Sequence, residues 1–350
     1  MSKRVKKAVK RAKLAYLWVT RILLVPSRQG VSLPRKLALN VNGGYLADQH
    51  VLYDFDHQDR KEYLSEFDWY RSRYINAPFD SMLNNKVIAT EVLQHHAKVP
   101  EVLLIKNRGL VSVPGDELVN RDLRRVLDVA KAAGSSFMKP IGAGKGIGVR
   151  RLDLLGDQTL LDGAPVSTAD LMDLFKREDA WFLSRAVEQH PDLAGLFPGA
   201  TNTVRIVTLR DPESGKLEVF FAVLRIGTKE TAPVDNGSRG GLVARVHLET
   251  GAVSRARRLW ESGEFAKHPD TGATIDGFVV PKWSELVELA LRLAAAFPYL
   301  HLVAWDMLVA EDGIYVVEAN TSTGVNIIQM WGPQREGRLG EFFRAHGAIK

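Results

Sequence analysis

Apolar residues recur with the spacing of strands through the second half of the chain. The segments "NTVRIVTL" (202–209), "KLEVFFAVLRIG" (216–227) and "LHLVAWDMLVAEDGIYVVEAN" (300–320) are rich in β-branched and aromatic residues, and turn-forming stretches separate them. The last segment predicts a hairpin that turns at "AEDG". By contrast, "WSELVELALRLAAAF" (283–297) has apolar residues at helical spacing. The region therefore predicts strands accompanied by a helix.

The first half alternates between helical and extended patterns. "NNKVIATEVLQHHAKVPEVLLI" (84–105) predicts a helix that ends before Pro100 and a strand after it. In residues 122–153 a helix should stop at Gly134, followed by a strand, a glycine-rich loop and another strand. "WFLSRAVEQ" (181–189) reads as a strand, and we expect it to open a second unit.

This order of elements predicts an α+β fold with two main units. Residues 59–75 are rich in aromatic and charged residues and predict one helix or two. We expect the following segments: a basic arm (1–30), an N-terminal α/β region (31–110), the two main units (111–183 and 184–330), and a C-terminal helix or tail (331–350).

Composition limits the classes of function. The 350 residues are 45% hydrophobic and 25% charged, which is ordinary for a soluble globular protein. The absence of cysteine excludes disulfides, thiolate metal ligands and a cysteine nucleophile. Of the 47 Lys and Arg residues, nine lie in residues 1–30, which leaves 38 against 41 acidic residues in the rest. A nucleic-acid partner is therefore not expected, since it would need basic residues spread over the folded body.

The basic arm has the pattern of an amphipathic helix that should end by Pro26. Its apolar run from Leu14 to Val19 is far shorter than the ~20 residues that span a bilayer. Tyr16 and Trp18 beside basic residues suit a membrane interface. One expectation is therefore a cytoplasmic protein whose residues 1–28 make peripheral contact with the inner face of the membrane. Docking on the protein's own body, or on another partner, remains open. The shared helix face comprises Val5, Val9, Ala12, Tyr16, Val19 and Leu23.

The loop in "FMKPIGAGKGIGV" (137–149) does not match two familiar phosphate-binding motifs. A P-loop needs Ser or Thr after its lysine, whereas Lys145 is followed by Gly146. The dinucleotide fingerprint fails because Ile147 and Val149 stand where its third glycine is required. Two readings remain: a flap whose backbone N–H groups cover an anion, or a glycine-rich hairpin turn.

Oxygen-bearing side chains gather in the predicted hairpin at 300–320. Asp306 lies in an apolar strand, and Glu318 and Asn320 lie two residues apart on one face of the next strand. Oxygen ligands without His or Cys suit a hard cation such as Mg²⁺. The alternative is ordinary salt bridging at a sheet edge.

Together these features resemble ATP-grasp enzymes, and more closely the sugar-transfer-associated ATP-grasp family. The resemblance extends from about Leu83 to Met330 and implies two α+β subdomains that grip ATP, with 111–183 as the lid and 184–330 carrying the metal site. The segments that carry it are "LNNKVIATEVLQHHAKVPE", "SSFMKPIGAGKGIGV", "VEQHPDLAGLFPGATNTVRIVT", "VDNGSRGGLVARVHLETGAV", "HPDTGATIDGFVVPKW", "AWDMLV" and "VVEANTSTGVNIIQ".

The resemblance also implies residue roles. Lys86 and Lys139 would contact the ATP phosphates, and Arg205 would neutralise the γ-phosphate. Lys229 and Arg239 lie in a segment that often contacts phosphate or acceptor. Two Mg²⁺ ions would be held by Asp306, Glu318 and Asn320, and the flap over the phosphates would comprise Gly142, Gly144, Lys145, Gly146 and Gly148.

One segment departs from the family pattern. Where members usually show acidic residues between the two grasp units, residues 183–186 read Leu-Ser-Arg-Ala. Backbone groups recognise adenine there, so binding is compatible with this change. Glu188 is the best remaining candidate for a ribose contact.

The implied activity is ATP-dependent ligation of a carboxylate to an amine or similar nucleophile, with an acyl phosphate intermediate and release of ADP and phosphate. Small-molecule carboxylate and amine or sugar substrates of cell-surface polysaccharide or specialised metabolite biosynthesis would fit the family. Two alternatives stay open: a kinase acting on a hydroxyl group, and a non-catalytic nucleotide-binding module at a membrane.

Overall fold

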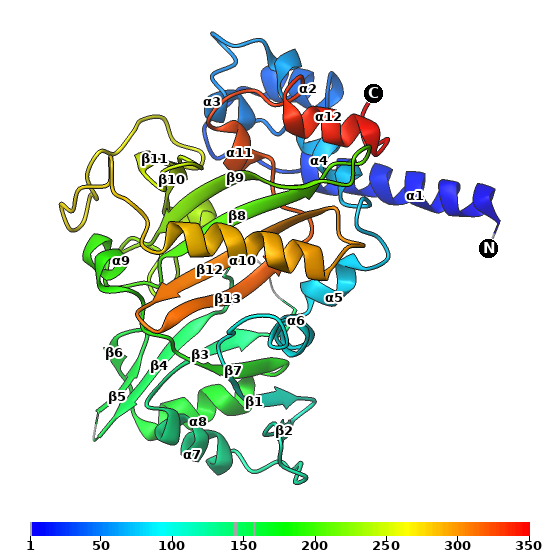
Figure 1. The fold of residues 1–350 in the computed structure, drawn as a ribbon. Helices are drawn as coiled ribbons and strands as arrows, with labels where there is room; N and C mark the ends of the chain where they lie inside the picture. Colours follow the sequence, from blue (N-terminus) through cyan, green and yellow to red (C-terminus); the bar gives the residue numbers. More distant parts are fainter. Residues whose placement is uncertain (1, 143–145, 157) are drawn as a thin grey trace.

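Two antiparallel sheets form the body of the molecule in this computed structural model, which describes residues 2–142, 146–156 and 158–350 (Figure 1). Within those residues the first sheet has seven strands in the order β2-β1-β7-β3-β4-β5-β6, and the second has six in the order β11-β10-β9-β8-β12-β13. The protein therefore has the mixed α and β architecture that the sequence predicts, with its described strands arranged in two sheets.

The first sheet carries two helices, α7 and α8, on one face. Val126 and Ala130 of α7 and Phe175 of α8 are buried in one apolar cluster with strand residues. Gly134 ends α7 with a φ of +73°, a conformation that glycine adopts without strain. The elements are β1 (Val102–Asn107), β2 (Leu110–Ser112), α7 (Arg124–Ala133), β3 (Ser135–Pro140), β4 (Arg150–Leu155), β5 (Gln158–Leu161), β6 (Ala164–Pro165), α8 (Thr168–Arg177) and β7 (Trp181–Arg185).

The position of β7 corrects the sequence interpretation, which placed this strand in the second unit. It lies between β1 and β3 in the first sheet, and Trp181 is paired with Lys106 on one side and with Pro140 on the other. Both edges of β7 are therefore hydrogen-bonded, and Trp181 through Ser184 are all buried, with Trp181 and Leu183 packed in the apolar cluster that also contains α7 and α8 residues. The chain order could not reveal this because the pairing is non-local.

The second sheet is covered on both faces. Helix α10 packs on one face, as Figure 1 shows, and α11 and α12 lie on the other. Every residue of β12 is buried, which explains its unbroken apolar run. The predicted hairpin is confirmed, with Ala310 opposite Gly313 at its turn. The elements are α9 (Pro191–Leu196), β8 (Thr203–Arg210), β9 (Leu217–Ile226), η3 (Gly237–Arg239), β10 (Leu242–Val246), β11 (Val253–Arg258), α10 (Trp283–Ala296), β12 (Leu302–Ala310), β13 (Gly313–Asn320), α11 (Asn326–Gln329) and α12 (Arg338–Ala345).

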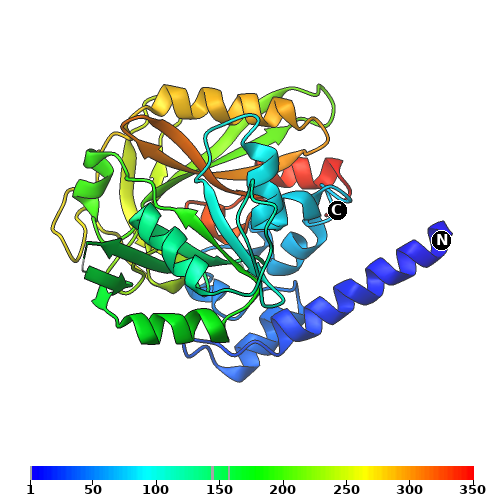
Figure 2. The ribbon, with the colours of Figure 1, turned by 90° about the horizontal axis from the view of Figure 1, so that it is seen from below.

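Short helices make up the N-terminal region. The first helix, α1, ends before Pro26 as predicted, and it extends away from the body (Figures 1 and 2). None of the described helices is both long and apolar enough to cross a bilayer. The elements are α1 (Lys3–Trp18), η1 (Val19–Leu23), α2 (Leu33–Val41), α3 (Gln49–Leu52), η2 (Arg60–Glu62), α4 (Glu66–Ser72), α5 (Asp80–Asn84) and α6 (Lys86–Leu93).

Candidate functional site

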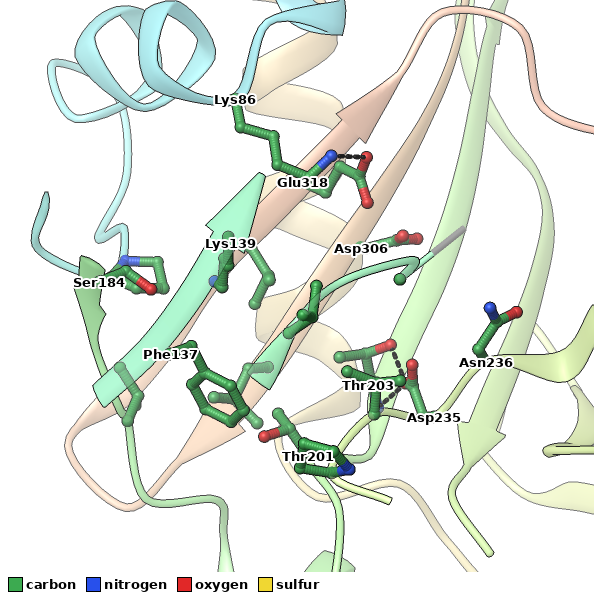
Figure 3. A pocket seen from close by; sticks show the side chains of 18 of the residues that line it. Lys86, Phe137, Lys139, Ser184, Thr201, Thr203, Asp235, Asn236, Asp306 and Glu318 are labelled. Atoms are coloured by element: carbon green, nitrogen blue, oxygen red, sulfur yellow. Dashed lines mark hydrogen bonds and ion pairs between the residues drawn. The ribbon is translucent and has the colours of Figure 1, made fainter. Parts of the chain in front are cut away.

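A pocket lies between the two sheets and takes its walls from both (Figure 3). Part of its lining is apolar, and the rest carries charges of both signs, so the pocket suits a ligand with an apolar and an anionic end. The apolar side chains include Pro100, Phe137, Val149, Phe182, Val187, Leu308 and Val317, and the charged ones include Lys86, Lys139, Arg225, Asp235, Asp306 and Glu318.

The hairpin of β12 and β13 brings the three predicted metal ligands together. Asp306 lies directly opposite Glu318, and Asn320 is two residues further along β13. The side-chain amide Nδ2 of Asn320 lies 3.4 Å from Oδ2 of Asp306. A register irregularity follows Asp306, so the ladder is locally uneven beside these polar residues.

Two arginines hold the Asp306 carboxylate. Nε and Nη2 of Arg205 each donate to it at 2.6 Å, and Nη1 of Arg225 donates to Oδ2 at 2.9 Å. Burial alone would raise the pKa of Asp306, but the two guanidinium groups outweigh burial and hold its pKa below the usual value. Burial likewise opposes the charge on Arg205, yet Asp306 raises the pKa of that guanidinium.

Arg225 and Asp235 are site residues that the sequence interpretation missed. Nη2 of Arg225 donates to Oδ1 of Asp235 at 2.6 Å, so this arginine bridges two carboxylates. Oδ2 of Asp235 accepts from the backbone N–H of Thr203 at 2.8 Å and also from its hydroxyl. Burial raises the pKa of Asp235 despite these donors. The one available signal was an arginine within the apolar strand pattern "FFAVLRIG".

The opposite wall contributes two lysines. Lys86 begins α6, and its Nζ lies 3.3 Å from Oε1 of Glu318. Lys139 lies on β3, where burial lowers its pKa to about 8; the charge of Glu318 counteracts this and that of Lys86 adds to it. Figure 3 shows Lys86 reaching across to Glu318 of the hairpin, with Lys139 on the neighbouring strand β3. The two predicted phosphate-contacting lysines therefore face the hairpin that carries Asp306.

The glycine-rich loop joins β3 to β4 beside this pocket. Gly144 and Lys145 lie outside the described residues, and Gly142 is exposed. Gly146 lines the pocket with a φ of +63°, and a Cβ atom there would come within 3.3 Å of Val234. A Cβ atom on Gly148, whose φ is +73°, would lie 3.0 Å from Pro140. Both positions favour glycine, and the loop reaches the segment that carries Asp235.

The atypical segment 183–186 contributes one unusual polar atom. Ser184 is buried and lines the pocket, and its Oγ has no hydrogen-bond partner within the described parts of the chain. Such a group carries a desolvation cost unless a ligand satisfies it. The adjacent Arg185 also lines the pocket, and its Nε donates to Glu101 at 2.7 Å. Ser184 is therefore a candidate contact to the polar edge of a bound ligand.

Three of the residues with predicted roles, and two histidines of the segments that resemble the family, lie outside the pocket lining. Glu188, Lys229 and Arg239 are exposed and are not part of the pocket lining, so their roles stay predictions. His190 caps α9, accepting from the backbone N–H of Asp192. The buried ring of His268 stacks on Phe197 and contacts the backbone oxygen of Gly227.

The hairpin residues Asp306, Glu318 and Asn320 offer oxygen ligands of the kind that Mg²⁺ prefers. The described residues contain no group of three or more His, Cys, Asp or Glu side chains able to hold a metal ion, so the protein ligands at this hairpin would be two carboxylates and the amide oxygen of Asn320. Two carboxylates and an amide match the oxygen preference of Mg²⁺. Four donors are directed at the Asp306 carboxylate, which has about four lone-pair sites to accept hydrogen bonds. The donor set fits the ion provided that it replaces guanidinium contacts at Asp306.

Comparison with known proteins gives a family match. The family described as sugar-transfer associated ATP-grasp matches residues 67–340. No curated protein matches the chain.

Several solved structures are similar at low identity. An ADP complex of N5-carboxyaminoimidazole ribonucleotide synthetase (purK) is 13% identical over 70% of this chain and 46% of its own, with a TM-score of 0.41. The ATP-grasp ligase PsnB with a precursor variant, Mg and ADP is 14% identical over 78% and 61%, with a TM-score of 0.41. D-alanyl-alanine synthetase A from Vibrio cholerae O1 is 17% identical over 71% and 58%, with a TM-score of 0.39. The chain spans less than two thirds of the length of each.

Proposed function

This chain belongs to the sugar-transfer-associated ATP-grasp family, and from that premise we propose that it is an ATP-dependent ligase that joins a carboxylate to an amine or similar nucleophile. The observation that carries the proposal is the pocket itself. Its lining places Lys86 and Lys139 on one wall and Asp306, held by Arg205 and Arg225, on the other. This combination suits a nucleoside triphosphate, because its several negative charges need cations on more than one side.

Different side chains of the pocket would bind different parts of MgATP. Lys86 and Lys139 would pair with phosphate oxygens, while the loop containing Gly146 would offer backbone N–H groups. Asp306, Glu318 and Asn320 would hold Mg²⁺, which neutralises charge on phosphate oxygens when bound. The apolar wall with Phe137, Phe182 and Leu308 would receive the base, and Ser184 Oγ would gain the partner it lacks within the described residues.

The chemistry needs positioning more than a reactive side chain. A substrate carboxylate oxygen attacks the γ-phosphorus, the bond to the β-phosphate oxygen breaks, and ADP leaves. The amine nitrogen then attacks the acyl carbon, and phosphate leaves as an amide forms and the amine loses a proton. Arg205 and Arg225 would stabilise the negative charge that develops during both transfers.

The link to sugar transfer in the family description supports a proposal for the class of substrate. We place the acceptor among the amines and sugars of cell-surface polysaccharide or specialised metabolite biosynthesis. Such an acceptor would enter beside Thr201, Thr203 and Asp235, which add polar groups to the lining of the pocket.

Product accounting tests the proposal. The protein is incubated with MgATP and pools of carboxylates, amines and sugars, and ADP, AMP and free phosphate are quantified. A ligase yields ADP and phosphate in equal amounts, and Asp306→Asn abolishes both. Asp312→Asn, in the exposed turn of the same hairpin, is the matched control and should retain turnover. ADP without free phosphate would identify a kinase, AMP would contradict an acyl phosphate, and no turnover in any pool would favour the non-catalytic alternative.

A further inference from the structure

Helix α1 packs on the body through one side only. Ile22 is fully buried just beyond it, and Leu14, Leu17 and Trp18 are half-buried. The indole Nε1 of Trp18 donates to the backbone oxygen of Asn40 at 3.2 Å. The ammonium group of Lys10, in the middle of the helix, lies 4.6 Å from the ring centroid of Tyr74, and the part of the helix before Lys10 extends away from the molecule (Figures 1 and 2).

The apolar stripe of α1 is on the side that the body leaves uncovered. Val5, Val9 and Tyr16 are 46%, 41% and 68% exposed, and Val19 is exposed as well. Their spacing of three and four residues places them on one helix face together with the exposed Ala12. Apart from the half-buried Leu23, the stripe that the sequence predicted therefore faces solvent, and the body leaves it uncovered in this structure.

A second apolar row lies on the neighbouring helix α2. Leu33, Leu37 and Val41 recur at every fourth position, and all three side chains are exposed. Arg35 and Lys36 lie between them in the sequence. The N-terminal region therefore presents exposed apolar residues from two helices, accompanied by basic residues.

The charges around the stripe are all of one sign. Residues 1–30 contain nine Lys and Arg and no Asp or Glu. At about 100° per residue, Arg4 and Arg11 border the stripe on one side and Lys13 on the other, and all three are exposed. A second copy of the chain would bring two such arms together and meet like-charge repulsion, whereas an anionic surface with an apolar interior complements both features.

We propose that α1 lies in the interface of an anionic membrane, with Val5, Val9, Ala12, Tyr16 and Val19 inserted and the flanking cations at the lipid phosphates. Tyr16 suits this depth because its ring is apolar and its hydroxyl is polar. Docking through a separate helix leaves the ATP pocket on the body free to bind its substrates. The proposal does not depend on the chemistry of that pocket.

Flotation with vesicles tests the proposal on the full chain. The wild-type protein should bind phosphatidylglycerol-containing vesicles, bind neutral phosphatidylcholine vesicles much less, and lose affinity as salt rises. Val9→Asp combined with Tyr16→Asp should weaken binding to anionic vesicles at least tenfold. Leu118→Asp combined with Val119→Asp, at exposed positions in the first sheet's loops, should leave binding unchanged.

Two further measurements separate the contribution of the cations from that of the apolar stripe, and membrane binding from self-association. Reversal of Arg4, Arg11 and Lys13 to Glu leaves the apolar stripe intact and should also abolish binding to anionic vesicles. Sedimentation reports whether the chain self-associates through the stripe. The proposal is overturned if the wild-type chain ignores anionic vesicles, if the stripe variant binds them as well as wild type, or if the stripe variant instead dissociates a dimer.

Discussion

Arg205 on β8 and Asp306 on β12 lie directly opposite each other in the second sheet, and two hydrogen bonds of 2.6 Å join their side chains. Three neighbouring antiparallel strands, β9, β8 and β12, carry Arg225, Arg205 and Asp306, so the sheet ladder sets their relative positions. A site built on paired strands is held more rigidly than one built on loops. The arginine is therefore positioned before any ligand arrives, as electrostatic stabilisation of a transition state requires.

Replacement of Arg205 by Lys should lower turnover about 10²–10³-fold while changing ATP affinity less than tenfold. Lysine keeps the charge but loses the planar two-donor fork, which donates twice to Asp306 in the free protein and would donate to phosphate oxygens once Mg²⁺ takes its place at Asp306. ADP release at saturating ATP is the measurement. Arg245→Lys, at an exposed position on β10, is the control. Equal turnover of the Arg205 variant and wild type would contradict the assigned role.

The affinity for MgATP should fall about tenfold between pH 7 and pH 9, because burial lowers the pKa of Lys139 to about 8. Below this pKa the ammonium group is charged and attracts phosphate, and above it the charge is lost. Lys139→Arg stays charged over the whole range, so its affinity should not change with pH. Calorimetry at both pH values measures the effect, and a parallel pH dependence in the arginine variant would refute the assignment to Lys139.

Ser184→Ala should weaken ATP binding about fivefold without lowering the free energy of unfolding. The buried Oγ has no partner within the described residues, so its removal costs the free protein nothing, whereas a hydrogen bond to the ligand contributes about 1 kcal/mol. Ser136 provides a matched control, since its Oγ is also buried without such a partner but lies outside the pocket lining. Ser136→Ala should alter neither quantity. Unchanged ATP affinity in Ser184→Ala would remove this residue from the site.

Asp235→Asn should lower the free energy of unfolding by about 1–3 kcal/mol. The carboxylate accepts from Arg225 and from both the N–H and the hydroxyl of Thr203, whereas an amide has only one oxygen to offer. Chemical denaturation measures the loss. Asp276→Asn breaks an exposed pair with Arg255 and should cost about 0–1 kcal/mol at most. Equal losses in the two variants would show that the buried network around Asp235 contributes no more to the free energy of unfolding than an exposed ion pair.

The site residues that lie close together in the chain could be predicted from the sequence. Asp306, Glu318 and Asn320 belong to a single hairpin, and its turn sequence and strand alternation fix which residues meet. The same holds for the glycine loop between β3 and β4, whose flanking strands are adjacent in the chain.

The remainder depends on non-local pairing. The partners of β7 are β1 and β3, which no periodicity reveals, and the strand was therefore assigned to the wrong unit. Arg225 becomes a site residue only because β9 pairs with β8 and brings it opposite Thr203. Asp235 lies in a loop segment whose sequence predicted only a turn. Whether the apolar stripe of α1 faces solvent or the body likewise depends on tertiary packing, which the helical pattern does not reveal.

The most direct test is a calorimetric titration of ATP, with and without Mg²⁺, into the wild-type chain and Asp306→Asn. We expect one nucleotide bound per chain, binding that requires Mg²⁺ for full affinity, and a loss of that Mg²⁺ dependence in Asp306→Asn. Absence of ATP binding by the folded wild-type chain, or Mg²⁺ dependence that survives in the variant, would contradict the claim that this pocket holds MgATP.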